Sequence, residues 1–305
     1  MAVAESLMLK GSAVAMSAAD SDRWATARGE SITIEGVGVA YWRTTDEHSS
    51  TVIMLHGLGG DHVGLAGLAG RLNAEVIAPD LPGYGSSQPL PGQHSLTGYA
   101  DVVEQLRSRL GLARFTLLGH SLGGSIALVY ASRYGAALDS SLCLLNPVID
   151  AATPAAWLGK FYYDVCGRLP RGLGRVLLTS RPVVYLSDRL LFASDDWETR
   201  RRILQRDYVT ARLSALRAVQ EVYLSLAHAP FDRYATEIQA PTLLVTGDRD
   251  QLCTPRSLFR LQRRMPRATV EIVPNAGHLL PVERPDAAAK PINGFLLHGA
   301  TVTGR

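Results

Sequence analysis

Short apolar runs alternate with longer amphipathic stretches along most of the chain. Two stretches, residues 96–110 and 122–134, carry apolar side chains at helical spacing. Strands are predicted at residues 51–55 (TVIML), 75–79 (EVIAP), 115–118 (FTLL), 141–145 (SLCLL), 241–246 (PTLLVT) and 269–273 (TVEIV), and as a pair within residues 31–44. Near-continuous apolar strands separated by helices are typical of parallel strands buried on both faces. The pattern therefore predicts an α/β fold: a mostly parallel central sheet with helices on both faces.

One segment interrupts the alternation. Residues 147–240 contain no clear strand and are rich in Leu, Arg and Tyr, which indicates several helices. Such an insertion is too long for an ordinary loop. We therefore predict a helical cap at residues 147–232, inserted into a core formed by residues 26–146 and 233–300. Residues 1–25, rich in Ala and Ser, are expected to form a flexible leader.

Composition and charge exclude several classes of protein. Of the 305 residues, 47% are hydrophobic and 19% are charged, unlike a disordered, collagen-like or coiled-coil chain. The formal net charge of only +3 gives no reason to expect nucleic acid as a partner. No apolar run reaches the length of about 18 residues that a membrane helix needs, so no stable membrane insertion is expected. Cys143, Cys166 and Cys253 fit no metal pattern and indicate a reducing, cytoplasmic location.

The sharpest chemical signal is the segment GHSLG at residues 119–123, between a predicted strand and a predicted helix. A serine on so tight a turn needs neighbours without side chains, and Gly119 and Gly123 supply them. The turn lifts the Ser121 hydroxyl above the sheet, where the amides of the following helix point at any developing anion. We therefore predict Ser121 as a nucleophile.

A serine hydroxyl needs a base within hydrogen-bond reach and an acid to orient that base. In this architecture the expected chain order is Ser, then Asp or Glu, then His. Asp250 lies in the loop after residues 241–246, and His278 lies in the loop after residues 269–273. Asp248 fits the acid position equally well by sequence distance, and one of the two aspartates is expected to satisfy only the turn. Asp80, at the end of another strand, is predicted to anchor its loop.

Acyl transfer also requires amide donors for a developing oxyanion. The amide of Leu122 follows the nucleophile directly. The second donor should come from the glycine-rich segment HGLGG at residues 56–60, and we assign it to the amide of Leu58. These two amides form the predicted oxyanion hole.

At this point the sequence resembles the α/β-hydrolase fold superfamily. The resemblance runs from about residue 29 to about residue 295 and rests on MLHGLGG, DLPGYGSS, LLGHSLGGSIAL, TGDRDQLCTP and NAGHLLPVERP. It implies a Ser121–His278–Asp250 triad, with Asp250 as the second Asp of a G-x-x-D turn. It also implies hydrolysis of an ester, thioester or lactone of a small-molecule acyl substrate, without cofactor or metal. Epoxide hydrolases and haloalkane dehalogenases of this fold carry Asp as nucleophile, and Ser121 argues against both.

Three other functions stay open at this point. A carbon–carbon bond hydrolase of a vinylogous diketone acid uses the same triad but needs cap groups that bind a carboxylate. A small-molecule receptor can retain the triad and signal through its cap. A membrane-active lipase needs an apolar-aromatic anchor. Candidates for the carboxylate site are Arg168, Arg175 and Arg181, and those for the anchor are Trp157, Phe161, Tyr162 and Tyr163. No motif indicates the acyl group or the oligomeric state.

Overall fold

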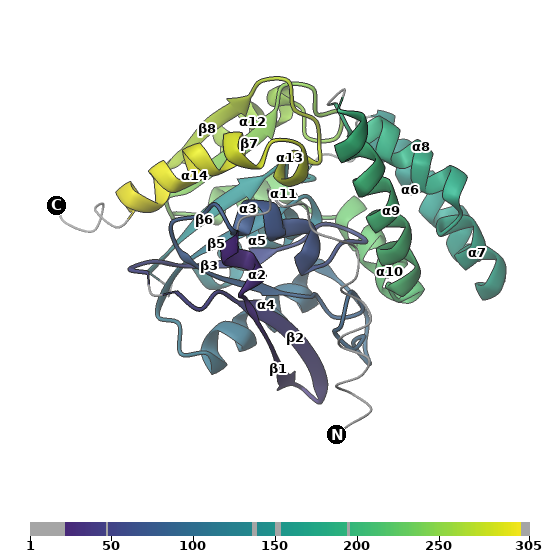
Figure 1. Ribbon diagram of the computed structural model, residues 1–305, viewed down its shortest axis with the longest axis horizontal. Coiled ribbons are helices and arrows are strands. Elements are labelled where there is room, and N and C mark those ends of the chain that lie inside the picture. Colours follow the sequence, from purple (N-terminus) through teal and green to yellow (C-terminus); the bar gives the residue numbers. More distant parts are fainter. Residues whose placement is uncertain (1–21, 47, 136–138, 150–153, 194–195, 300–305) are drawn as a thin grey trace.

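A central eight-stranded sheet organises the described part of the chain (Figure 1). The structure is a computed structural model, and it describes residues 22–46, 48–135, 139–149, 154–193 and 196–299. The strand order is β1-β2-β4-β3-β5-β6-β7-β8; β1–β2 and β2–β4 pair antiparallel and the other neighbours pair parallel. The strands are β1 (Arg28–Ile34), β2 (Val37–Arg43), β3 (Thr51–Leu55), β4 (Glu75–Pro79), β5 (Arg114–His120), β6 (Asp139–Leu145), β7 (Thr242–Gly247) and β8 (Ala268–Val273). The predicted mostly parallel sheet is confirmed.

Helices cover both faces of this sheet and form a group beyond one of its ends (Figure 1). Those associated with the sheet are α2 (Asp22–Ala25), the 3-10 helix η1 (His62–Leu65), α3 (Ala66–Ala69), α4 (Leu96–Arg109), α5 (Leu122–Tyr134), α11 (Phe231–Glu237), α12 (Pro255–Gln262), α13 (Leu280–Glu283) and α14 (Pro285–Gly299). Those between β6 and β7 that form the separate group are α6 (Pro154–Arg168), α7 (Arg171–Leu178), α8 (Arg181–Leu191), α9 (Trp197–Leu213) and α10 (Leu216–Ala227).

The alternation of side chains along β3 explains why its sequence is apolar throughout. Ile53 and Leu55 pack into a hydrophobic cluster with residues of α4 and α5. Val52 and Met54 point the other way and pack with residues of α3 and α14. Because both faces of the strand are buried, a polar residue has no place until the strand ends. Polar side chains therefore collect in the loops at the carboxyl ends of the strands, where ligands bind in open α/β sheets.

The inserted helices α6 to α10 lie between β6 and β7 and contact the core. Helix α10 packs against α4, and α9 packs against α13, so the insertion rests on the core at two places. Helix α11 already begins at Phe231 and packs against α5. Helix α11 thus belongs to the helices associated with the sheet.

A short helix precedes the first strand. Residues 1–21 lie outside the described part of the chain. Asp22–Ala25 form helix α2, and Trp24 on that helix is only 5% exposed and packs into the core. These four residues thus belong to the core, because the indole buries a large apolar surface there. No helix in the described ranges combines the length and the apolar character that a bilayer span requires.

Candidate active site

Ser121 occupies the turn between β5 and α5 in a backbone conformation that non-glycine residues rarely adopt. Its φ and ψ angles are 54° and −118°. A Cβ atom on Gly119 would lie 2.1 Å from the carbonyl oxygen of Gly123, and one on Gly123 would lie 2.4 Å from the carbonyl oxygen of Leu55. No side chain fits at either position, so the two glycines permit the turn. Such strain is retained where it serves a site, here by presenting the hydroxyl above the sheet edge.

The predicted base and acid lie beside this hydroxyl. His278 Nε2 is 2.8 Å from Ser121 Oγ, and His278 Nδ1 is 2.9 Å from Asp250 Oδ2. The three side chains come from the loops after β5, β7 and β8, and all three residues are less than 9% exposed. Residues separated by up to 157 positions thus form one hydrogen-bonded chain, in the order expected from the sequence.

The environment of Asp250 favours its ionised form. Burial alone would raise the pKa of this carboxyl, but the adjacent imidazole of His278, the Asn146 amide and the backbone amide of Cys253 outweigh that effect and hold the pKa below its ordinary value. An ionised Asp250 accepts the proton of His278 Nδ1–H. Nε2 is then left with a lone pair toward Ser121, whose hydroxyl donates to it.

Asp248, the competing aspartate, has a different position. Its Oδ1 accepts a hydrogen bond of 3.2 Å from the amide of Ala276, and its own amide donates to the carbonyl of Val273. These contacts tie the loop after β7 to the segment after β8. Of the two aspartates, therefore, Asp250 contacts the imidazole and Asp248 supports the turn.

Two residues that the sequence did not single out complete the surroundings of the triad. Asn146, at the end of β6, is fully buried with φ 47°, and its Nδ2 donates to Asp250 Oδ2 at 2.7 Å. His120 donates from Nε2 to the carbonyl oxygen of His278 at 2.9 Å. Burial lowers the pKa of His120 to about 3, so its ring is neutral. Asn146 could have been found by its position, because, like Asp80, it directly follows an apolar strand, where polar site residues collect.

A buried glutamate holds the loop of His278 against the inserted helices. Glu283 accepts hydrogen bonds from the amides of Gly277 and Leu279, on either side of the histidine, both at 3.2 Å. It also accepts one of 3.0 Å from the amide of Ala193, just after α8. The amide of His278 itself donates to the carbonyl of Leu191 in α8 at 2.8 Å. The position of the imidazole is thus tied to that of the insertion. No local pattern indicates this role, although Glu283 lies within the segment NAGHLLPVERP.

The two predicted oxyanion donors lie on the two segments that flank the serine. Leu122 is the first residue of α5, and its amide has no acceptor within the helix. Leu58 follows Gly57, where a Cβ atom would lie only 3.1 Å from the Cβ of Ser121. The glycine-rich loop therefore approaches Ser121 so closely that a side chain at Gly57 would crowd it.

His56 fixes the start of this loop. Its Nδ1 donates to the carbonyl of Gly57 at 2.8 Å, and its Nε2 accepts from the amide of Leu81 at 2.9 Å. One nitrogen must carry a proton and the other a lone pair, which requires a neutral ring. Burial lowers the pKa of His56 and keeps the ring in that form.

Asp80 holds the next loop, as the sequence predicted. This fully buried carboxylate accepts hydrogen bonds from the amide and Nδ1 of His62, both at 2.9 Å, and from the amide of Ser86 at 2.8 Å. Burial would raise its pKa, but the contact with His62 and the amide of Ser86 hold the pKa below its ordinary value. Its bonds therefore tie the start of η1 to the loop after β4.

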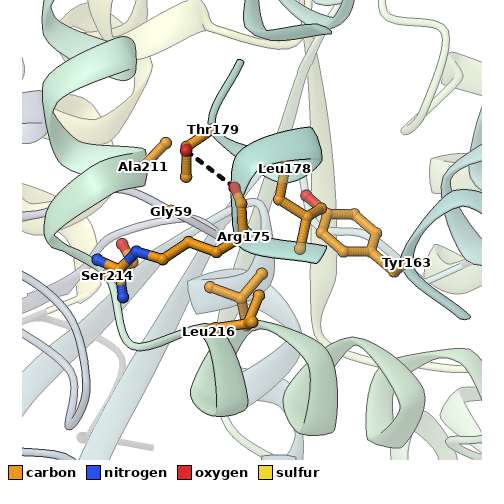
Figure 2. A pocket seen from close by; sticks show the side chains of 9 residues that line it. Gly59, Tyr163, Arg175, Leu178, Thr179, Ala211, Ser214 and Leu216 are labelled. Atoms are coloured by element: carbon orange, nitrogen blue, oxygen red, sulfur yellow. Dashed lines mark hydrogen bonds between the residues drawn. The ribbon is translucent and has the colours of Figure 1, made fainter. Parts of the chain in front are cut away.

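A cavity of about 60 Å³ lies between the glycine-rich loop and the inserted helices (Figure 2). Gly59 forms its wall on the core side, one residue after Leu58. The other lining residues come from α6, α7, α9, α10 and the adjoining turns: Tyr163, Arg175, Leu178, Thr179, Ala211, Ser214, Leu216 and Val219. No group of three metal-binding side chains occurs in the described part of the chain.

Known proteins share both sequence and fold with this chain. The sequence model described as alpha/beta hydrolase family matches residues 52–290. Lipase 3 of Moraxella sp. (strain TA144) is 24% identical over 275 residues, which cover 85% of this chain and 81% of the relative. A membrane phospholipase A, described as a bacterial virulence factor, matches with a TM-score of 0.76 at 25% identity over 98% of this chain and 93% of its own. A thermophilic esterase from Thermogutta terrifontis, with malate bound, matches with a TM-score of 0.75 at 23% identity over 90% of this chain and 99% of its own.

Proposed function

Because the chain belongs to the alpha/beta hydrolase family, we propose that it is a serine hydrolase that cleaves an ester, thioester or lactone of a small molecule. The observation that carries the proposal is the hydrogen-bonded chain from Ser121 through His278 to Asp250, with contacts of 2.8 and 2.9 Å. Relatives that are named as a lipase and an esterase support ester bonds as the target.

In the proposed mechanism, Ser121 Oγ attacks the substrate carbonyl while His278 Nε2 takes its proton. Asp250 keeps the imidazole in the required tautomer and stabilises the imidazolium. The amides of Leu58 and Leu122 donate to the tetrahedral oxyanion, and each such donor contributes roughly 3 to 4 kcal/mol to lowering the barrier.

Collapse of the first intermediate releases the alcohol or thiol, which takes its proton from His278. The acyl group stays on Ser121 as an ester. His278 then removes a proton from water, whose hydroxide oxygen attacks this ester and releases the acid. All the groups that react are supplied by the chain, the substrate and water.

The division of labour follows from the two parts of the chain. The core, predicted as residues 26–146 and 233–300, carries the reacting groups. We propose that the insertion acts as a cap that encloses the acyl substrate. The three cysteines are free and buried, in keeping with the cytoplasmic location that the sequence predicts; that location stays a prediction.

The test compares hydrolysis of a 4-nitrophenyl ester by the wild type and by Ser121→Ala. We expect kcat to fall by a factor of about 10⁴ or more, because the other triad members cannot replace the nucleophile. Ser132→Ala, farther along the same helix, is the matched control and should retain wild-type activity. Comparable thermal unfolding of all three proteins would exclude misfolding. If Ser121→Ala keeps most of the activity, the proposal is wrong.

A further inference from the structure

Three arginines of the insertion lie close together, and two of them contact one tyrosine. Arg212 Nη1 donates to the hydroxyl of Tyr208 at 2.8 Å, and the Arg181 guanidinium lies over the same ring, 5.1 Å from its centroid. Arg175 joins them, because its Nη2 donates to the carbonyl of Arg212 at 2.5 Å. We call Arg175, Arg181 and Arg212 the arginine cluster. Its members come from α7, α8 and α9, and all three are exposed.

No carboxylate of the described residues pairs with any member of the cluster. The nearby acids are engaged elsewhere: Asp207 pairs with Arg206, and Asp164 pairs with Arg168. Hydrogen bonding from Arg212, together with the charge of Arg181, lowers the pKa of Tyr208, which reflects the positive potential at this point. Like charges held together without counter-charges repel one another, and a bound anion relieves that repulsion.

Arg175 connects the cluster to the cavity. Figure 2 shows its side chain crossing from α7 toward Ser214, along the cavity wall. Gly59, next to the proposed oxyanion donor Leu58, lines the same cavity, and most of the remaining lining is apolar. A largely apolar cavity is thus lined both by a cation, Arg175, and by a residue of the proposed oxyanion donor loop.

We propose that the natural substrate is an ester with an anionic group, a carboxylate or a phosphate, and that Arg175 binds this group. The inference rests on the proposed ester hydrolysis at Ser121. A guanidinium presents a planar fork of N–H donors that matches either anion. The cavity that Arg175 lines also borders Gly59, beside Leu58, so in the proposed substrate a short apolar chain joins the anion to the ester. Arg181 and Arg212 strengthen the attraction without direct contact.

The test uses two esters that differ only in charge: mono-4-nitrophenyl glutarate, which is anionic, and its neutral methyl ester. We expect the wild type to have a higher kcat/KM for the anionic ester than for the neutral one. Arg175→Gln should lower the ratio of these two kcat/KM values by about 10-fold or more, mainly by raising the KM of the anionic ester. Added salt should lower the same ratio in the wild type by screening. Arg168→Gln, an exposed cap arginine paired with Asp164, is the matched control and should keep the wild-type ratio.

Binding to Ser121→Ala separates this inference from catalysis. In calorimetry, monomethyl glutarate should bind more tightly than dimethyl glutarate, and the added Arg175→Gln substitution should remove that difference. Propyl phosphate as a competitor tells a phosphate site from a carboxylate site. If the wild type hydrolyses neither ester but the charged compound still binds through Arg175, the proposed hydrolase function is wrong and the anion-binding site is supported. A wild type without charge preference in either assay, or an equal loss for both compounds in Arg175→Gln, would overturn the inference.

Discussion

At the scale of single residues, two side chains that contact the triad, His120 and Asn146, are buried but neutral. His120 and Asn146 contact His278 and Asp250 through hydrogen bonds, and neither adds a charge next to the carboxylate. A buried neutral donor satisfies its acceptor without the desolvation cost of a second ion. The site therefore keeps its negative charge on Asp250, where it can stabilise an imidazolium.

The neutrality of His120 has a consequence for stability at acid pH. Its pKa is about 3 in the folded protein against 6.5 for the free side chain, so between these values the unfolded state binds the extra proton. Stability is therefore lost as the pH falls from about 6.5 toward about 3. His120→Gln keeps a donor for the carbonyl of His278 but does not titrate. We expect the slope of unfolding free energy against pH to be less steep in this variant by up to about 1.4 kcal/mol per pH unit.

Urea unfolding at several pH values in this window measures the slope. His228→Gln, at an exposed position, should keep the wild-type slope, because its ring is solvated in both states. A His120→Gln variant with the same slope as the wild type would show that this histidine is protonated in the folded protein.

At the scale of elements, the loop after β8 links the proposed catalytic histidine to the cap. Glu283 accepts from the amides of Gly277, Leu279 and Ala193, and the carbonyl of Leu191 accepts from His278. A Cβ atom on Gly277 would lie 2.6 Å from that same carbonyl, so the two segments are in close backbone contact. A displacement of the end of α8 would therefore displace the imidazole.

Substitution of Glu283 should slow the reaction of Ser121 without changing the reacting groups. Glu283→Gln keeps one oxygen as an acceptor, whereas Glu283→Ala leaves three amides without theirs, at a cost of about 1–3 kcal/mol for each that stays buried. We expect the rate of phosphonylation by a fluorophosphonate to fall in the order wild type, Gln, Ala, and by up to about 100-fold in the Ala variant if its imidazole is displaced by about 1 Å.

Glu271→Gln, on an exposed position of β8, should react like the wild type. The rate is expressed per folded molecule, so a loss of stability alone does not lower it. If the Ala variant does not fold, the rate of the Gln variant still tests the prediction. A Glu283→Ala protein that folds and reacts as fast as the wild type would contradict the positioning role.

The elements could be predicted from the sequence because their signals are local. Strand β3 is apolar on both faces, and the glycines around Ser121 are required by the turn itself, so each is recognisable within a few residues. The contacts of Glu283 and Asn146 depend on partners that are distant in the chain. The burial of Trp24 likewise could not be predicted from the residues around it, because the side chains that cover the indole come from distant parts of the chain. Such roles arise from tertiary packing, which one-dimensional patterns do not contain.

At the scale of the whole molecule, the two parts of the chain have different chemical tasks. The sheet brings three loops together at one edge, and the end of α8 in the insertion contacts the loop that carries His278. We propose that the insertion encloses the substrate there. Of the aromatic residues considered as an anchor, Phe161 is 58% exposed, whereas Tyr163 lines the cavity; the side chain of Trp157 lies outside the described residues. Tyr163 thus lines the cavity and is not available as a membrane anchor.

The central claim is that Ser121 carries the acyl group between the two half-reactions. The most direct measurement is rapid mixing with 4-nitrophenyl acetate, acid quenching, and mass analysis of the tryptic peptide that contains residues 115–133. The account predicts a stoichiometric burst of nitrophenol and one acetyl group on Ser121, both absent in Ser121→Ala and strongly slowed in His278→Ala. Acetylation of a different residue during turnover, or hydrolysis at the wild-type rate in the Ser121→Ala protein, would contradict it.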